Sequence, residues 1–176
     1  PKTRNVINLP ENYLGVAARI AAIDFRLGLL EDRNLVDNLL DRAAQQFTSG
    51  VLYADDAPPT GRFDRYSNEY ARFIWDAAET AERKDLLAAL KPTLTTQMRL
   101  WWDLVKEDGY GYAWGRSLGV VSYLDTLEIV GFLGQHPEFR PAPLKDLASA
   151  YLLAWRWLRS DYRDDAHLLS VFGFGR

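Results

Sequence analysis

Apolar residues recur at helical spacing along nearly the whole chain, and the strict alternation that is typical of strands is almost absent. Three segments, residues 33–47, 85–106 and 143–159, carry one apolar stripe opposite charged positions, which predicts helices at the surface of a core. We expect Pro92 to start or to kink the second of these helices. The three stripes consist of Val36, Leu39, Leu40, Ala43, Ala44 and Phe47; Leu90, Leu94, Met98, Trp101 and Val105; and Leu144, Leu147, Ala148, Tyr151, Trp155 and Leu158.

Three further segments, residues 12–28, 68–82 and 117–133, are apolar nearly all round. A helix without a polar face is normally buried on both sides, so these segments predict inner helices. Inner and outer helices therefore alternate along the chain. The outer positions of Trp101, Trp102, Trp155 and Trp157 favour packing in the core over stacking on a ligand.

An internal repeat connects the predicted helices. An offset of 54 residues relates Phe47 to Trp101 and Trp155, and it also relates three further sets of apolar positions. Such a period is typical of stacked αα-hairpins. The sequence thus predicts an all-α fold of three hairpins, at about residues 12–47, 68–106 and 117–159, in a single domain over residues 1–176. The arrangement expected is part of an (α/α) toroid or an open solenoid, and we expect the chain to be a fragment of a longer protein because it begins with proline.

The amino-acid composition excludes several kinds of catalytic and metal site. The 176 residues contain no cysteine, which excludes disulfides, thiolate catalysis and cysteine-bound metals, and two histidines leave little material for a metal site. No cofactor is indicated. A net charge of −3 without a basic block argues against a nucleic-acid partner. No apolar run reaches the roughly 18 residues of a membrane helix.

The first group of candidate residues belongs to a long loop, residues 48–67, and to the helix that follows it. Long aromatic loops on a helical scaffold often carry function. Asp64 and Glu69 are candidates for the two carboxylates of a glycosidase, while Tyr66, Asn68 and Tyr70 supply the rings and amide that bind sugars. The structural alternative is that Ser67 or Asn68 caps the helix and that Asp64 lies at its positive end.

A second group follows in the loop at residues 107–117. Glycines there allow tight turns from which the aromatic rings are expected to project. Arg116 suits a substrate carboxylate because its guanidinium group donates two parallel hydrogen bonds. Alternatively, Trp114 plugs the end of a ring of helices and Arg116 pairs with a helix C-terminus. The aromatic candidates for substrate binding are Tyr110, Tyr112 and Trp114.

The third group lies on the otherwise apolar segment 117–133. Asp125 and Glu128 are three residues apart, so both are candidates to face a central cavity; pairing with an arginine is the alternative. Asn12 and Tyr13 open the first inner helix at the equivalent place. His167, in the region after the last helix, is a candidate for acid–base chemistry or substrate binding.

Four short motifs give the chain a resemblance to a known group of proteins. They are Tyr-x-Asp at 53–55, Arg-Phe-Asp-x-Tyr at 62–66, Asp-Gly at 108–109 and Trp-Gly-Arg-Ser-Leu at 114–118. The layout resembles the six-hairpin (α/α)-toroid carbohydrate-active proteins and is most similar to a bacterial family of unassigned function. The wider group includes hydrolases of uronic-acid sugars and polysaccharide lyases.

The resemblance implies acidic catalytic roles for Asp64 and Glu69, a sugar groove lined by Tyr66 and Tyr70, and a substrate carboxylate held by Arg116. The leading hypothesis is accordingly a glycoside hydrolase acting on a uronate-containing poly- or oligosaccharide. The first alternative is a lyase in which Tyr70 or Tyr66 takes the proton. The second is a non-catalytic helical-repeat module that binds glycan or protein.

Overall fold

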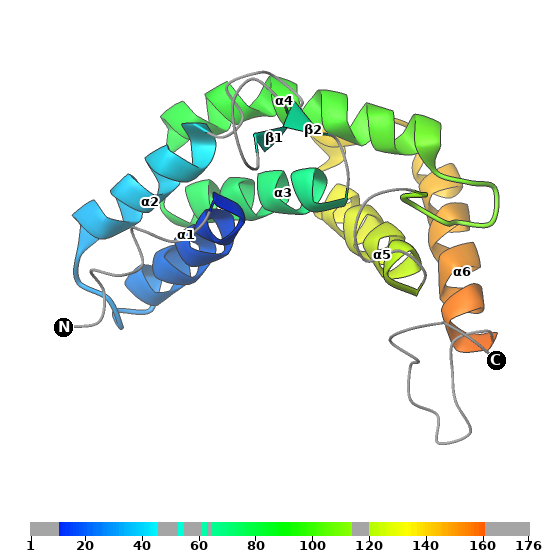
Figure 1. Cartoon of the computed structure of the whole chain (residues 1–176), viewed down its shortest axis with the longest axis horizontal. Helices are drawn as coiled ribbons and strands as arrows, with labels where there is room; N and C mark the ends of the chain where they lie inside the picture. Colours follow the sequence, from blue (N-terminus) through cyan, green and yellow to red (C-terminus); the bar gives the residue numbers. More distant parts are fainter. Residues whose placement is uncertain (1–10, 46–52, 55–60, 63–64, 114–119, 161–176) are drawn as a thin grey trace. The chain divides into compact units, whose positions relative to one another are not determined.

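The chain is all-α, as its periodicity predicts. The computed structural model describes residues 11–45, 53–54, 61–62, 65–113 and 120–160 (Figure 1). Within these residues the helical bounds lie within a few residues of those expected from the sequence. The α-helices are α1 (Glu11–Arg26), α2 (Arg33–Gln45), α3 (Arg65–Thr80), α4 (Lys84–Leu104), α5 (Val120–Gln135) and α6 (Leu144–Ser160), with a 3₁₀ turn η2 at Pro137–Phe139.

A small β-ribbon interrupts the predicted loop between α2 and α3. Strand β1 (Tyr53–Ala54) pairs antiparallel with β2 (Gly61–Arg62), and Tyr53 lies opposite Arg62. The ribbon is not predictable from the sequence pattern, because strands of two residues are too short to show alternation.

The chain divides into two compact units, Pro1–Thr96 and Gln97–Arg176, and the boundary falls inside α4. The single domain expected from the sequence stays a prediction. In the first unit α1 packs against both α2 and α3. Its core is formed by the inner faces of these helices. Fully buried side chains there are Ala18, Ala22, Val36, Leu39, Leu40, Ala43, Ala71, Ile74, Ala77 and Ala78.

In the second unit α5 packs against α6, as expected for the third hairpin. The buried face of α6 consists of Leu147, Ala150, Ala154 and Leu158. The predicted stripe was therefore wrong for Leu144, Ala148, Tyr151 and Trp155, which are exposed. The reason is steric, because two alanines let the backbone of the loop at Gly109 approach α6 more closely than large side chains would allow.

Residues related by the 54-residue repeat are not equally buried. Leu90 and Leu94 on α4 are buried like Val36 and Leu40 on α2, but Leu144 on α6 is 52% exposed. Trp101 is completely buried whereas its repeat partner Trp155 is 47% exposed. Closure into a toroid stays a prediction.

Pro92 neither starts nor ends α4, which begins eight residues earlier. Proline has no N–H group, so the Ala88 carbonyl, four residues earlier, loses its helical hydrogen bond. The helix tolerates this because Ala88 and Pro92 both lie at exposed positions, where water can bind the carbonyl. The side chain of Thr96 donates to the Pro92 carbonyl oxygen at 2.9 Å.

Helices α1 and α3 end in the same backbone motif. After α1, the Leu29 amide donates to the Asp24 carbonyl and Gly28 adopts a φ of 74°. After α3, the Arg83 amide donates to the Ala78 carbonyl, and Glu82 stands at the equivalent position with a φ of 59°. This is the Schellman arrangement, in which glycine is the usual residue. Glu82 therefore occupies a left-handed conformation that directs the following Arg83 toward α2.

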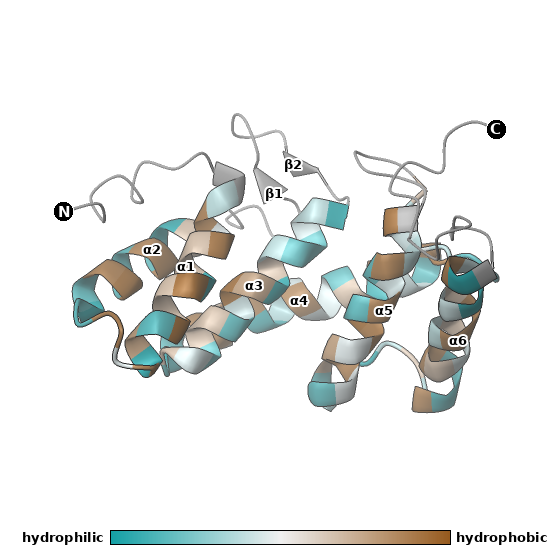
Figure 2. Cartoon of the chain, turned by 90° about the horizontal axis from the view of Figure 1, so that it is seen from below, coloured by the Kyte–Doolittle hydropathy of each residue, from teal (hydrophilic) through white to brown (hydrophobic). Residues whose placement is uncertain are grey.

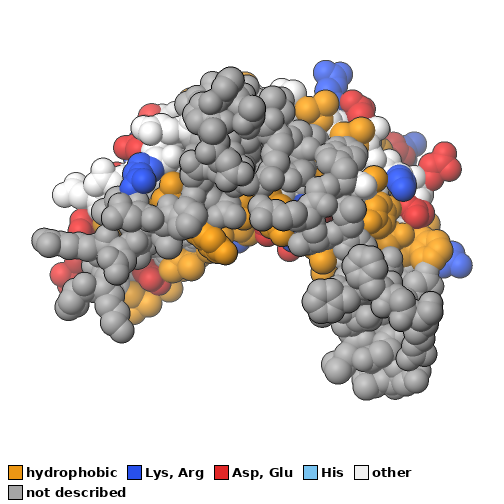
Figure 3. Space-filling model, in the orientation of Figure 1, with side chains coloured by type: hydrophobic (Ala, Val, Ile, Leu, Met, Phe, Trp, Pro, Cys, Tyr) orange, Lys and Arg blue, Asp and Glu red, His pale blue; other side chains and the backbone are white. Residues whose placement is uncertain are grey.

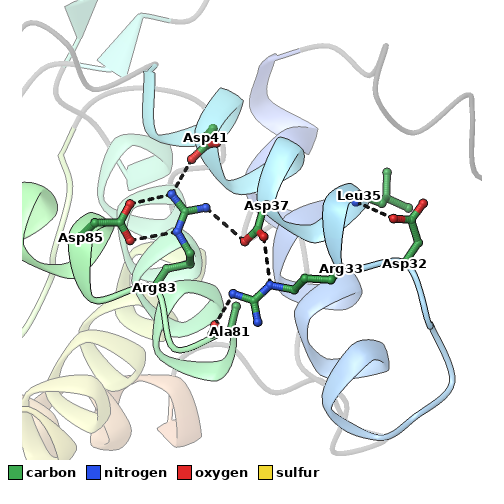
Figure 4. A network of polar contacts seen from close by, with 8 residues as sticks. All are labelled: Asp32, Arg33, Leu35, Asp37, Asp41, Ala81, Arg83 and Asp85. Carbon is green, nitrogen blue, oxygen red and sulfur yellow. Dashed lines mark hydrogen bonds and ion pairs between the residues drawn. The ribbon is translucent and has the colours of Figure 1, made fainter.

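Arg83 is the centre of a polar network in the first unit (Figure 4). Its guanidinium group donates to Asp37 at 3.2 Å, to Asp41 at 2.7 Å and to Asp85 at 2.7 Å. Arg33 extends the network, since it donates to Asp37 at 3.0 Å and to the Ala81 carbonyl at 2.8 Å. The network joins α2 to the turn between α3 and α4.

The charged groups in this network shift one another's pKa values. Burial opposes ionisation of Asp37, but hydrogen bonds from Arg33 and Arg83 outweigh it and lower the pKa of that carboxyl group. The hydrogen bond from Arg83 lowers the pKa of Asp85 to about 2. In return, the carboxylates, Asp85 first, raise the pKa of Arg83 above its ordinary value.

We expect Arg83→Met to lower the free energy of unfolding of the first unit by about 1–2 kcal/mol, because three carboxylates lose their shared partner. The check is urea denaturation at neutral pH. Lys91→Met is the matched control, since Lys91 is exposed on α4 and should tolerate the change. Equal midpoints for the two variants would show that the network adds nothing to stability.

We also expect the first unit to lose stability as the pH falls from about 4 to about 2. Asp37 and Asp85 have lowered pKa values when folded, so the unfolded chain binds more protons in this range and acid favours unfolding. Urea midpoints measured across this range should fall in the wild type. They should fall less in Arg83→Met, whose carboxylates have lost the partner that lowers their pKa.

Candidate functional site

The first turns of α3 bring several predicted site residues together. Arg65 and Glu69 form an ion pair of 3.7 Å along the helix, and their side chains are only 15% and 16% exposed. The Arg65 guanidinium also lies over the Tyr66 ring, 5.1 Å from its centroid. Tyr66 in turn stacks on Tyr70 with ring centroids 6.0 Å apart. A half-buried carboxylate, a guanidinium and an aromatic face thus adjoin one another.

Helix α3 starts earlier than the sequence predicts. It begins at Arg65, so Ser67 and Asn68 lie inside the helix, both fully buried, and the expectation that one of them caps it was wrong. Asn68 instead accepts a hydrogen bond from the Arg72 side chain, one turn later, at 2.9 Å. The extra turn includes Arg65 in the helix, so that Arg65 and Glu69, four residues apart, lie on the same face and can form an ion pair.

Two polar residues of α5, Ser122 and Thr126, hold the preceding loop through hydrogen bonds, a role that was not predicted from the sequence. The Thr126 hydroxyl donates to the Gly109 carbonyl at 2.8 Å, and the Ser122 hydroxyl donates to the Tyr112 carbonyl at 2.8 Å. The Gly111 amide donates to the Ser122 carbonyl. Helix α5 therefore holds the loop at residues 106–113 through buried hydrogen bonds.

Asp108 organises the same loop from its other side. One carboxylate oxygen accepts from the Tyr110 amide at 3.0 Å, and the other accepts from the Tyr123 hydroxyl at 3.2 Å. The Tyr110 ring meets the Tyr123 ring edge-on, with centroids 5.0 Å apart. The signal for this task was the Asp-Gly pair itself, which is typical of turns.

The tyrosines of this loop do not both project from it. Tyr112 is only 1% exposed, so the expected projection of its ring is wrong; the ring belongs to the core of the second unit. Tyr110 is half-buried and remains partly accessible. A role in substrate binding stays a prediction for each of them.

Asp125 and Glu128 have different surroundings although they are one turn apart on α5. Asp125 is 1% exposed, whereas Glu128 is exposed to solvent. They therefore do not form a pair of buried carboxylates. A role in substrate binding stays a prediction for Asp125.

Tyr13, the candidate at the start of the first inner helix, is 55% exposed on α1. The remaining predicted site residues lie outside the described part of the structure. They are Asp64, Trp114, Arg116 and His167, together with the side chain of Asn12.

A cavity of about 480 Å³ lies in the first unit, where α1 ends, α2 begins and α3 ends. Phe25, Arg26, Arg33, Glu79 and Glu82 are among its lining residues. The sequence did not predict this cavity, because function was expected in the long loops and these residues lie at helix ends or in the short links between them. The Arg33 guanidinium on its wall is already bound to Asp37 and Ala81.

No protein-family model matches the chain, and neither a curated protein nor a solved structure matches it. Among the helices that the structure describes, none combines the length and the apolar character needed to cross a membrane.

Proposed function

We propose that the chain belongs to a carbohydrate-active protein, a glycoside hydrolase that acts on uronate-containing poly- or oligosaccharides. The observation that carries the proposal is the cluster on the first turns of α3, where Glu69 pairs with Arg65 beside the stacked rings of Tyr66 and Tyr70. Sugar sites need a carboxylate for bond cleavage and an aromatic face for the C–H side of the ring.

The proposed roles follow from the ion pair. A guanidinium group beside a carboxylate favours its ionised form, so Glu69 suits the part of base or nucleophile. Asp64, immediately before α3, is then the proposed general acid. Arg116 is proposed to hold the substrate carboxylate, and Tyr66 and Trp114 to stack on the sugar, with Tyr110 nearby in sequence as a further contact. The burial of Tyr70, at 8% exposed, suits it better to supporting Tyr66 than to taking a proton.

The test is the release of reducing sugar from oligosaccharides that contain glucuronate or galacturonate. We expect Glu69→Gln and Asp64→Asn each to lower the rate by at least about 100-fold, because each removes a proton-transfer or nucleophilic group. Glu31→Gln, at an exposed position in the turn after α1, is the matched control and should keep full activity. Urea midpoints of all variants should stay close to the wild type.

Three outcomes would contradict the proposal in different ways. Wild-type rates in both carboxylate variants would remove Asp64 and Glu69 from the mechanism. Ultraviolet absorbance of a new double bond in the product would indicate a lyase, since hydrolysis creates no unsaturation. Binding of the oligosaccharide without turnover would indicate a non-catalytic module.

A further inference from the structure

Helix α1 has an apolar face that nothing in the described structure covers. Its residues recur at spacings of three and four, and we call Tyr13, Val16, Ile20, Ile23 and Leu27 the α1 stripe. Val16 is half-buried, while Tyr13 and Ile20 are each 55% exposed, Ile23 is 42% exposed and Leu27 is 66% exposed. Figure 2 shows hydrophobic residues along α1 on the side turned to the viewer, and Figure 3 shows hydrophobic side chains at the surface in the region of α1.

This exposure contradicts what the sequence predicts for α1. A helix that is apolar nearly all round is normally buried on both sides, yet only the opposite face, with Leu14, Ala18 and Ala22, packs against α2 and α3. Helical hydrogen bonding continues to Leu27, whose amide donates to the Ile23 carbonyl at 2.9 Å. The stripe is therefore a straight and preformed surface of about four turns.

The size of the surface matches a contact between two copies. Together with Leu29, which is 75% exposed, the stripe leaves on the order of 500 Å² of apolar surface, as much as the largest patch on a typical monomer. A twofold contact counts this area twice and buries at most about 1,000 Å², the size of a weak or transient interface. A second copy of this chain is thus a sufficient partner.

The charges beside the stripe select an orientation. The spacing is that of a heptad in which Tyr13, Ile20 and Leu27 take the first core position and Val16 and Ile23 the second. Arg19 and Arg26 then lie along one edge, and Asp24 lies along the other. In a parallel pair this edge faces Asp24 of the second copy, whereas reversing one helix would bring the two arginine edges together. Arg19 already pairs with Asp76 of α3 at 3.1 Å, and its side chain, 43% exposed, would bridge that carboxylate and Asp24 of the second copy.

We propose that the chain forms a homodimer through the α1 stripe, with the two α1 helices parallel and in register. Because α2 and α3 already order α1, pairing does not have to create the helix. The contact lies outside the residues to which the glycoside hydrolase is assigned, apart from Asn12 and Tyr13 at its end. The dimer contact can therefore be tested independently of the proposed hydrolase activity.

The test is the molar mass in solution, measured by light scattering and sedimentation between about 1 and 100 µM, around the micromolar range expected for a modest interface. We expect the wild type to dimerise with rising concentration and Ile20→Asp to raise the dissociation constant at least tenfold. Leu152→Asp is the matched control, because Leu152 is 63% exposed on α6. Ile20 is already exposed, so Ile20→Asp should fold, and its circular dichroism should equal that of the wild type.

Two results would overturn the contact. One is a wild type that stays monomeric throughout this range, or a dimer that Ile20→Asp leaves intact. The other is a dimer that Leu152→Asp also dissociates, because that would indicate a head-to-tail contact between α1 of one copy and α6 of the next.

The absence of cysteine from the chain makes the orientation testable. Tyr13→Cys and Leu27→Cys each introduce a single thiol, at opposite ends of the stripe. In a parallel pair in register, each variant should form a disulfide-linked dimer under mild oxidation, since like positions face each other. A dimer in which neither variant crosslinks would overturn the parallel arrangement.

Discussion

Gly109→Ala should unfold the second unit at denaturant concentrations that leave the wild type folded, with a loss of about 3 kcal/mol or more. Gly109 has a φ of 83°, a conformation that costs a residue with a Cβ atom energy. The added Cβ would also lie 2.7 Å from both the Ala150 carbonyl oxygen and the Ala154 amide nitrogen of α6. Both neighbours are backbone atoms of a helix, so neither can move aside without loosening the contact between the loop and α6.

The measurement is hydrogen exchange followed by mass spectrometry, because it reports on each unit separately. Amides of α5 and α6 should lose protection in Gly109→Ala, while those of α1 and α2 should keep it. Gly131→Ala is the matched control: its Cβ would meet no atom within 4 Å at an exposed position on α5, so it should stabilise that helix by about 0.5–1 kcal/mol. Similar protection in both variants would show that the loop backbone is free to shift.

The same contact explains which parts of the fold the sequence predicts and which it does not. The existence and approximate extent of the helices follow from apolar spacing, which is a local property of the chain. The buried face of α6 does not, because it depends on how closely Gly109 approaches Ala150 and Ala154. A search for large apolar residues selects Tyr151 and Trp155, although the small residues make the contact.

For the candidate site, the sequence shows which residue types are unusual in their segments, but it does not show which residues they contact. The sequence marks Asp125 as unusual in an apolar helix, but polarity alone does not distinguish a ligand site from hydrogen bonds that hold a loop, such as those of Ser122 and Thr126. No role was assigned to Arg65 from the sequence, since its pairing with Glu69 depends on α3 starting one turn earlier than expected. Helix starts are set by a few local interactions and are therefore the least predictable bounds.

For the α1 stripe, the burial expected from the sequence and the exposure found in the structure differ, and the difference is informative. The sequence indicates that this face should be buried, and within this chain Ile20 and Ile23 remain exposed. Apolar area on a face that the sequence predicts to be buried is unfavourable in water, so the two observations together support the proposed partner. Neither of them alone would have identified the surface.

Trp101→Ala should cost the second unit about 3–5 kcal/mol, the usual range for deleting a buried tryptophan side chain. Trp101 is completely buried near the end of α4, beside the backbone of Gly111 and with its ring centroid 6.0 Å from that of Trp102. Trp155→Ala is the matched control, since its ring is 47% exposed on α6, and it should cost less than about 1 kcal/mol. Equal losses would support the 54-residue repeat, which makes the two tryptophans equivalent, over the burial observed here.

A second substitution at Trp101 separates its volume from its polar atom. Among the described residues, none accepts a hydrogen bond from the buried Trp101 Nε1. An unpaired buried donor costs about 1–3 kcal/mol, and Trp101→Phe removes that penalty while leaving a smaller cavity than alanine does. The two effects oppose each other, so we expect Trp101→Phe to lie within about 1 kcal/mol of the wild type in urea denaturation. A loss as large as that of Trp101→Ala would instead mean that the indole N–H has an acceptor, and that the tryptophan is held by a polar contact as well as by packing.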